Sequence, residues 1–225
     1  MKAPREVVPI LMEMIRFNSV LDVGCGTGTW LKVFSENGIT DFLGVDQDHQ
    51  NRSLLIPPAN FKVIDLHQPF DVGRKFDLIV ALEVAEHLHE ISADTFIDSL
   101  LRHGDTILFS AAIPGQGGQN HLNEQWPEYW QQKFRQRGFF LNDFLRRKIW
   151  NNQNIEWWYR QNILLVTKSK PDEDQMISVV HPELFNQVIQ NNTLSEKSLI
   201  EGRHGVRISL KILVNALRFK LKSIF

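Results

Sequence analysis

The sequence predicts an α/β fold in which a largely parallel sheet carries helices on both faces. Short β-rich runs alternate with segments of helical apolar spacing through about residue 168, and the run at 76–82 is nearly all apolar, as in a strand covered on both faces. In such sheets a ligand sits beyond the carboxyl ends of the strands, so the polar residues there are candidates for a site. They are the glycine loop at 24–28, Asp46, Asp65, and the segments 83–87 and 114–124.

Six β-rich runs and four helical segments make up this pattern. The first helical segment is amphipathic, since its apolar residues recur three or four positions apart, and a glycine lies shortly beyond each of the other three. The expected strands are 19–23, 42–45, 61–64, 76–82, 106–112 and 162–167, and the expected helices are 5–17, 30–37, 92–101 and 127–137.

Length and composition indicate one globular core of medium size. Of 225 residues, 43% are apolar and 23% are charged, which excludes a disordered chain, and the single cysteine, Cys25, excludes a disulfide scaffold. We expect a domain at 1–168, a polar linker with a short helix (182–190) at 169–202, and a helical extension at 203–225. The lone cysteine, with no apolar signal region or membrane-spanning run in the sequence, favours a cytoplasmic setting.

Charge is unevenly distributed along the chain. The last 23 residues hold six basic residues and no acid, which leaves 19 basic against 26 acidic residues in the first 202. An acidic body argues against general binding of nucleic acid. The tail predicts an amphipathic helix suited to the inner face of an anionic membrane, or to packing on its own domain or another subunit. Its apolar stripe comprises Val206, Leu210, Leu213, Val214, Leu217, Leu221 and Ile224, and its basic flank comprises Arg207, Lys211, Arg218 and Lys222.

The most informative stretch is the glycine loop that follows the first strand. Asp22 precedes three glycines spaced by two, Gly24, Gly26 and Gly28, which let the backbone turn sharply and approach a ligand closely. The free amides that begin the next helix suit a carboxylate or a phosphate. The spacing differs from the G-x-G-x-x-G of hydride-transfer enzymes, and no G-K-[ST] of a phosphate-binding P-loop follows. A tight strand–helix turn without a ligand is the structural alternative.

This loop resembles the first motif, D-x-G-x-G-x-G, of class I S-adenosylmethionine-dependent methyltransferases. The resemblance covers about residues 15–168 and implies a Rossmann-like, doubly wound, mostly parallel seven-stranded sheet. It implies that Asp22 and the glycine backbone hold the methionine part of the cofactor, that Asp46 binds the ribose hydroxyls, and that Asp65 accepts from the adenine amino group. Either of the last two acids could instead cap a turn. The expected cofactor-binding residues are Asp22, Gly24, Cys25, Gly26, Gly28, Asp46, Asp65, Leu66 and Leu82.

A second chemical cluster follows the fourth strand, in the E-V-A-E-H sequence at 83–87. If this segment turns helically, Glu83, Glu86 and His87 share one face, and His121 in the next loop reaches the same sheet edge. Carboxylates and imidazoles suit Mg²⁺ or Mn²⁺. Hydrogen bonds that close the loop are the alternative, in which case His121 or His87 is the natural general base. The expected catalytic residues are His121, His87 and Glu83, and the expected metal ligands are Glu83, Glu86, His87 and His121.

The cluster resembles the Glu-x-x-Glu-His motif and distal His of small-RNA 2′-O-methyltransferases, and a Glu-x-x-Glu-His motif also appears in ubiquinone-biosynthesis O-methyltransferases. The resemblance implies a metal that binds the acceptor hydroxyl and lowers its pKa.

The segments beyond the fifth strand form the expected acceptor side. A loop rich in glycine and amide side chains at 114–121 can approach a polar substrate closely, and aromatic residues at 126–130 and 157–159 can offer ring faces to a sugar. Trp130 and Phe134 instead fit the core face of a helix. The stretch from the glycines onward resembles a subgroup of bacterial methyltransferases associated with glycan and lipopolysaccharide assembly.

Together these features predict S-adenosylmethionine-dependent methyl transfer to a hydroxyl of a saccharide or another small hydroxylated acceptor, in glycan or lipopolysaccharide biosynthesis. One alternative is an RNA 2′-O-methyltransferase, against which the acidic body argues. Another is a non-catalytic, membrane-associated module that binds the cofactor. The sequence does not specify the acceptor, the choice between O- and N-methylation, or the oligomeric state.

Overall fold

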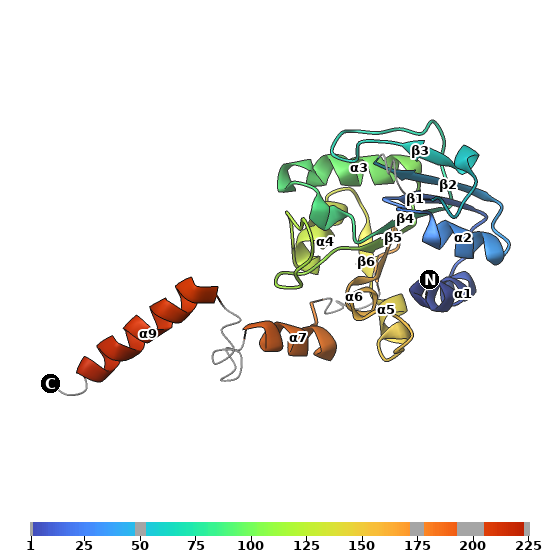
Figure 1. Cartoon of the computed structure of the whole chain (residues 1–225). Helices are drawn as coiled ribbons and strands as arrows, with labels where there is room; N and C mark the ends of the chain where they lie inside the picture. The colour runs from blue at the N-terminus through green and yellow to red at the C-terminus, as the bar shows by residue number, and fades with distance from the viewer. Residues whose placement is uncertain (1, 48–52, 172–177, 193–204, 223–225) are drawn as a thin grey trace. The chain divides into compact units, whose positions relative to one another are not determined.

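The computed structural model describes residues 2–47, 53–171, 178–192 and 205–222. They belong to two compact units, Met1–Leu184 and Phe185–Phe225. The first unit holds a sheet with its covering helices (Figure 1). The second holds most of helix α7 (Pro182–Asn192) and all of helix α9 (Gly205–Lys222). The expected short helix at 182–190 is therefore present, and the expected extension at 203–225 is helical over 205–222, with its other residues outside the described ranges.

The sheet contains the strands β1 (Ser19–Val23), β2 (Asp41–Asp46), β3 (Phe61–Val63), β4 (Leu78–Leu82), β5 (Ile107–Ser110), β6 (Phe140–Asn142) and β7 (Leu164–Thr167). Their order is β3-β2-β1-β4-β5-β7-β6. Strands β1 to β5 run parallel to one another, and β7 runs antiparallel to β5 and β6. The expected seven-stranded, mostly parallel sheet is therefore confirmed. Because β1 lies between β2 and β4, the loops after these three strands are neighbours at one edge.

Helices cover both faces of this sheet (Figure 1). They are α1 (Lys2–Met14), α2 (Thr29–Glu36), α3 (Ala93–His103), α4 (Pro127–Arg135), α5 (Phe144–Ile149) and α6 (Trp157–Asn162). One hydrophobic core joins the sheet to α3 and α4 through residues such as Phe96 and Trp130. The other joins it to α1, α2 and α5 through residues such as Leu11, Phe34 and Leu145. With a core on each face, every residue of the central strand β4 is buried, which confirms the doubly wound architecture.

Three elements were not expected from the sequence, namely β6, α5 and α6. Strand β6 has three residues and the two helices have six each, so none is long enough to show an apolar period. The expected strands at 76–82, 106–112 and 162–167 were also too long, since the ladder residues are Leu78–Leu82, Ile107–Ser110 and Leu164–Thr167. Buried loop residues beside a strand carry the same apolar signal as the strand itself, which explains the difference.

Candidate active site

The glycine loop turns back onto β2 where β1 ends. The amides of Gly24 and Cys25 both donate to the carbonyl oxygen of Val45, at 2.8 and 3.2 Å. Gly24 has φ +79°, and a Cβ there would lie 2.3 Å from Cγ2 of Val84, so neither the conformation nor the space admits a side chain. At Gly26, by contrast, a Cβ would meet open space. The loop therefore exposes bare backbone to whatever binds over β1.

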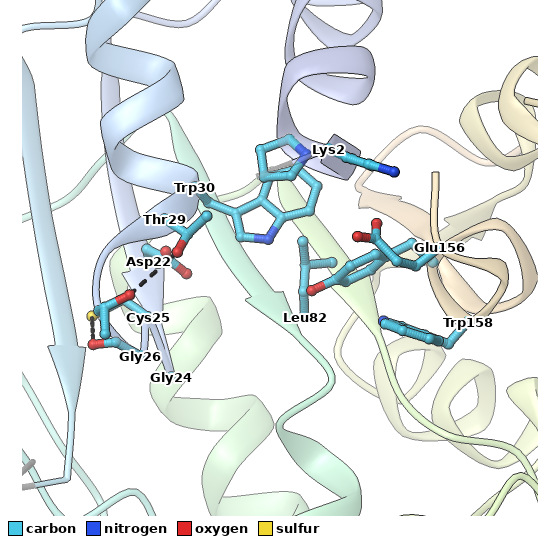
Figure 2. A pocket seen from close by; sticks show the side chains of 13 residues that line it. Lys2, Asp22, Gly24, Cys25, Gly26, Thr29, Trp30, Leu82, Glu156 and Trp158 are labelled. Carbon is cyan, nitrogen blue, oxygen red and sulfur yellow. Dashed lines mark hydrogen bonds between the residues drawn. The ribbon is translucent and has the colours of Figure 1, made fainter. Parts of the chain in front are cut away.

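Two pockets meet at this loop, since Gly24 and Gly26 line both of them. The first has a volume of about 360 Å³, and we call it the Trp30 pocket (Figure 2). The second has a volume of about 690 Å³, and we call it the His87 pocket. The Trp30 pocket is also lined by Asp22, Cys25, Trp30, Leu82, Trp158 and Tyr159, and the His87 pocket by Asp46, Leu66, Glu83, His87 and Asn120.

The Trp30 pocket contains two buried carboxylate oxygens that have no hydrogen-bond partner within the described ranges, Oδ2 of Asp22 and Oε2 of Glu156. Burial and, to a smaller extent, the charge of Asp46 raise the pKa of Asp22 to about 8. Lys2 of α1 lines the same pocket (Figure 2). The pocket thus offers acceptors for an ammonium group and a cation for a carboxylate. These residues fit the amino-acid part of S-adenosylmethionine, which carries both groups.

The His87 pocket contains the acid that was expected to bind a ribose. Asp46 ends β2, and its carboxylate accepts from the backbone amides of Gly26 and Gln47, each at 2.6 Å. Leu66 is buried in the wall of the same pocket. The pocket therefore combines a carboxylate with an apolar surface, which suits a nucleoside.

Two of the expected cofactor residues, Asp65 and Gly28, line neither pocket. Asp65 accepts from the backbone amide of His67 at 2.9 Å, and its side chain is 59% exposed, so it caps the turn after β3. Gly28 has φ +81° directly before α2, and a Cβ there would lie 2.8 Å from Ile56. These contacts give both residues a structural role, and a cofactor role for them stays a prediction.

Glu83 is not part of the group of described residues that could hold a metal ion, although it lies close enough to Glu86 for its charge to raise the pKa of that carboxyl. It follows β4 with φ +54°, a strained conformation for a residue with a side chain. Its carboxylate accepts from Nε2 of Gln116 and Nδ2 of Asn162, each at 3.0 Å, and burial raises its pKa. The chain turns sharply here instead of starting a helix, and Glu83 nevertheless lines the same pocket as His87. Sequence reasoning missed Gln116 and Asn162, since neither belongs to a recognisable motif.

Glu86, His87 and His121 do come together, with one potential ligand atom from each lying within 4.8 Å of the other two. Glu86 lies in the 3-10 turn η2 (Ala85–His87), and both oxygens of its fully buried carboxyl lack a hydrogen-bond partner among the described residues. Burial and the charge of Glu83 raise the pKa of Glu86 to about 9. A buried carboxyl without a partner is costly, and beside two imidazoles it completes a donor set that fits a divalent cation.

Both imidazoles are oriented by further contacts. Nδ1 of His87 lies 3.3 Å from the carbonyl oxygen of Asn120, and Nδ1 of His121 lies 2.9 Å from Oε1 of Glu124. Glu124 also accepts from two backbone amides of the loop at 114–124, each at 2.9 Å. These partners hold each ring through Nδ1, and Nε2 of His121 lies against the backbone of Gly118. The three-residue spacing of His121 and Glu124 was the available sequence signal.

The aromatic residues of the expected acceptor side divide into two groups. Trp130 and Phe134 are buried in the core, as their helical spacing predicted. Trp126 is 42% exposed, while Trp158 and Tyr159 line the Trp30 pocket. Lys2 and Glu156 line that pocket as well, although no sequence pattern singled them out.

This combination of fold and site defines a class of protein. A doubly wound sheet with an antiparallel β7, a bare glycine loop after β1 and an acid after β2 describe a cofactor-binding α/β methyltransferase. Residues 3–162 match the model of a family described as a methyltransferase domain, and the chain belongs to this family. A search among curated proteins found no match.

Solved structures with the same fold have little sequence identity to the chain. An S-adenosylmethionine-dependent methyltransferase from Clostridium acetobutylicum ATCC 824 is similar with a TM-score of 0.52 and 12% identity, over 74% of this chain and 90% of that one. The magnesium protoporphyrin IX methyltransferase of Synechocystis PCC 6803 is similar with a TM-score of 0.51 and 17% identity, over 74% of this chain and 83% of that one. An amino pentose methyltransferase of Micromonospora echinaspora is similar with a TM-score of 0.51 and 12% identity, over 74% of this chain and 92% of that one. These likenesses confirm the methyltransferase fold.

Proposed function

We propose that the chain binds S-adenosylmethionine across the two pockets and transfers its methyl group to a hydroxyl of a saccharide or another small hydroxylated acceptor. The observation that carries this proposal is the position of the Glu86, His87 and His121 cluster. His87 lines the pocket that also contains Asp46, and this pocket shares the glycine loop with the Trp30 pocket. Groups able to activate a hydroxyl therefore stand beside the proposed cofactor site.

The two pockets suggest a division of the cofactor. In the His87 pocket, Asp46 would accept from the ribose hydroxyls, and the buried side chain of Leu66 would contact the adenine. In the Trp30 pocket, the unpartnered oxygens of Asp22 and Glu156 would accept from the ammonium group, and Lys2 would approach the carboxylate. Because Gly26 has no side chain, there is room above it for the part of the cofactor that joins the amino acid to the nucleoside.

Transfer to a hydroxyl requires a group that takes the acceptor proton as the new carbon–oxygen bond forms. S-adenosylmethionine supplies a methyl group that is already activated on a sulfonium, so positioning and proton removal are the tasks left to the protein. His87 is suited to accept this proton because burial lowers its pKa and so favours the neutral imidazole. A divalent cation held by Glu86, His87 and His121 would lower the pKa of a bound hydroxyl. Glu83 would position the loop after β4 rather than react, since its carboxylate is bonded to Gln116 and Asn162.

A saccharide acceptor is supported by the polar and aromatic surroundings. Glycines and amide side chains of the loop at 114–124 lie beside the His87 pocket, and aromatic rings line the Trp30 pocket. An amino pentose methyltransferase shares the fold, so this architecture is compatible with a sugar acceptor. RNA is disfavoured by the 19 basic against 26 acidic residues of the first 202.

The test follows a labelled methyl group from the cofactor into host lipid, carbohydrate, RNA and protein fractions, with and without a chelator. We expect label in carbohydrate or glycolipid, lost with the chelator and restored by Mn²⁺ or Mg²⁺. Label confined to RNA would overturn the proposed acceptor class. Label that persists with the chelator would mean that a histidine removes the acceptor proton without a metal ion. Cofactor binding without any label would favour the non-catalytic module.

A direct measurement separates metal binding from activity. Titration of the purified chain with Mn²⁺ alone should show one bound ion per chain. Glu86→Gln should lose this binding, whereas Glu90→Gln, a matched change at an exposed carboxylate, should keep it. Equal binding by both variants would remove the cluster from the proposal.

A further inference from the structure

Helix α9 belongs to the second unit, and none of its residues is among those that line the two pockets. At about 100° per residue its apolar side chains form one stripe about 100° wide. The stripe side chains are between 43% and 77% exposed, so no described residue of the second unit covers them. The members of this stripe are Val206, Leu210, Leu213, Val214 and Leu217.

The charges of α9 are of a single sign. The helix contains five basic residues and no acid, and Arg207 and Lys211 lie beside the apolar stripe. Across this basic band lie further apolar side chains, of which Ile208 is 48% and Phe219 is 78% exposed. The basic band is therefore bordered by apolar surface on both sides, and the sequence analysis had identified only one of these two surfaces.

We propose that α9 lies in the surface of an anionic lipid membrane, with its apolar side chains among the acyl chains and its basic band at the headgroups. A lipid surface supplies an apolar interior for the exposed apolar side chains and negative charge for the basic ones. The five basic residues also exclude the alternative of a spanning helix, and none of the helices in the described ranges is long and apolar enough to cross a membrane.

Other occupants fit the helix less well. A second copy of α9 could cover the apolar stripe, but it would bring a second set of basic residues against the first without an acid to pair them. A nucleic acid would match the charge and leave the apolar side chains in water. Of these three partners, only the lipid surface satisfies both features.

The experiment measures co-sedimentation of the full chain with phosphatidylcholine vesicles that contain or lack phosphatidylglycerol. We expect binding only to the anionic vesicles, weakened by high salt. Arg207→Gln combined with Lys211→Gln should weaken this binding about 30-fold. The matched pair Lys75→Gln and Lys148→Gln, at exposed lysines of the first unit, should leave it unchanged. Leu213→Ser combined with Leu217→Ser should weaken it about 100-fold or more.

Three results would overturn the proposal. The first is a folded chain that does not bind anionic vesicles, or binds them equally well after the changes in α9. The second is a dimer in solution that the Leu213→Ser and Leu217→Ser variant dissociates, which would make a second copy the occupant. The third is tight RNA binding that depends on Arg207 and Lys211 in the absence of lipid binding.

Discussion

At the scale of single residues, the site is marked by buried carboxyl groups whose oxygens have no protein partner in the described ranges. Asp22, Glu86 and Glu156 each have such an oxygen. Folding tolerates groups of this kind at a cost, so they point to a ligand that pairs with them. Asp22 and Glu86 could be predicted because each belongs to a motif. Glu156 could not, because only the tertiary fold brings it to the pocket.

The raised pKa of Asp22 predicts a pH-dependent stability. Its pKa is 3.8 ordinarily and about 8 in the folded chain, so between these values the folded state holds a proton that the unfolded state has lost. Stability should therefore fall as pH rises from about 4 to about 8, because the unfolded state binds fewer protons there. Asp22→Asn should flatten this part of the decline in melting temperature of the protein without cofactor. Identical pH profiles for the two proteins would contradict the assignment.

A side chain at Gly24 should destabilise the fold by steric overlap, and the same change at Gly115 is the control for the backbone contribution. Gly24→Ala adds a Cβ 2.3 Å from Val84 to a residue at φ +79°, whereas Gly115→Ala adds one at φ +85° with open space around it. The second change should cost about 1–2 kcal/mol of unfolding free energy for the backbone alone. The first should cost more by about 1–3 kcal/mol, for overpacking. Urea unfolding measures both, and equal losses would show that Val84 moves aside freely.

At the scale of elements, the loop at 114–124 positions His121, one of the two histidines of the cluster. Glu124 ties this loop to itself through two backbone amides and holds the ring of His121. The sequence showed that the loop was polar and rich in glycine, but not that its acid would orient its histidine. Such contacts depend on how a loop closes, which apolar periodicity does not encode.

The same loop gives a prediction for Glu124→Gln. Glutamine has one acceptor oxygen where the carboxylate has two, so it cannot keep the His121 contact and both loop amides. Methyl transfer should therefore fall about 10- to 100-fold, and the melting temperature should fall as well. Glu90→Gln is the control at an exposed carboxylate in the turn η3 (Glu90–Ser92). An unchanged rate for Glu124→Gln would mean that the orientation of His121 does not matter to the reaction.

At the scale of the whole molecule, the alternation of apolar strands and amphipathic helices was sufficient to predict the sheet and its two covered faces. Strand β6 and helices α5 and α6 escaped prediction because short elements are stabilised by tertiary packing, as at Leu145 in the core. The position of Asp46 followed from the rule for carboxyl ends of strands, and that of Asp22 from the motif to which it belongs. The sharp turn at Glu83 was not predicted, because the sequence pattern there is compatible with a helix.

The central claim is that the bare backbone at Gly26 lies under a cofactor that spans both pockets. The most direct measurement is titration of the chain with S-adenosylmethionine, followed by the fluorescence of Trp30 and Trp158 in the pocket wall. We predict saturable binding that Gly26→Val abolishes, since the new side chain would fill the open space there. Gly38→Val, also at positive φ with open space but outside both pockets, should retain binding. Undiminished binding by a folded Gly26→Val variant would contradict the account.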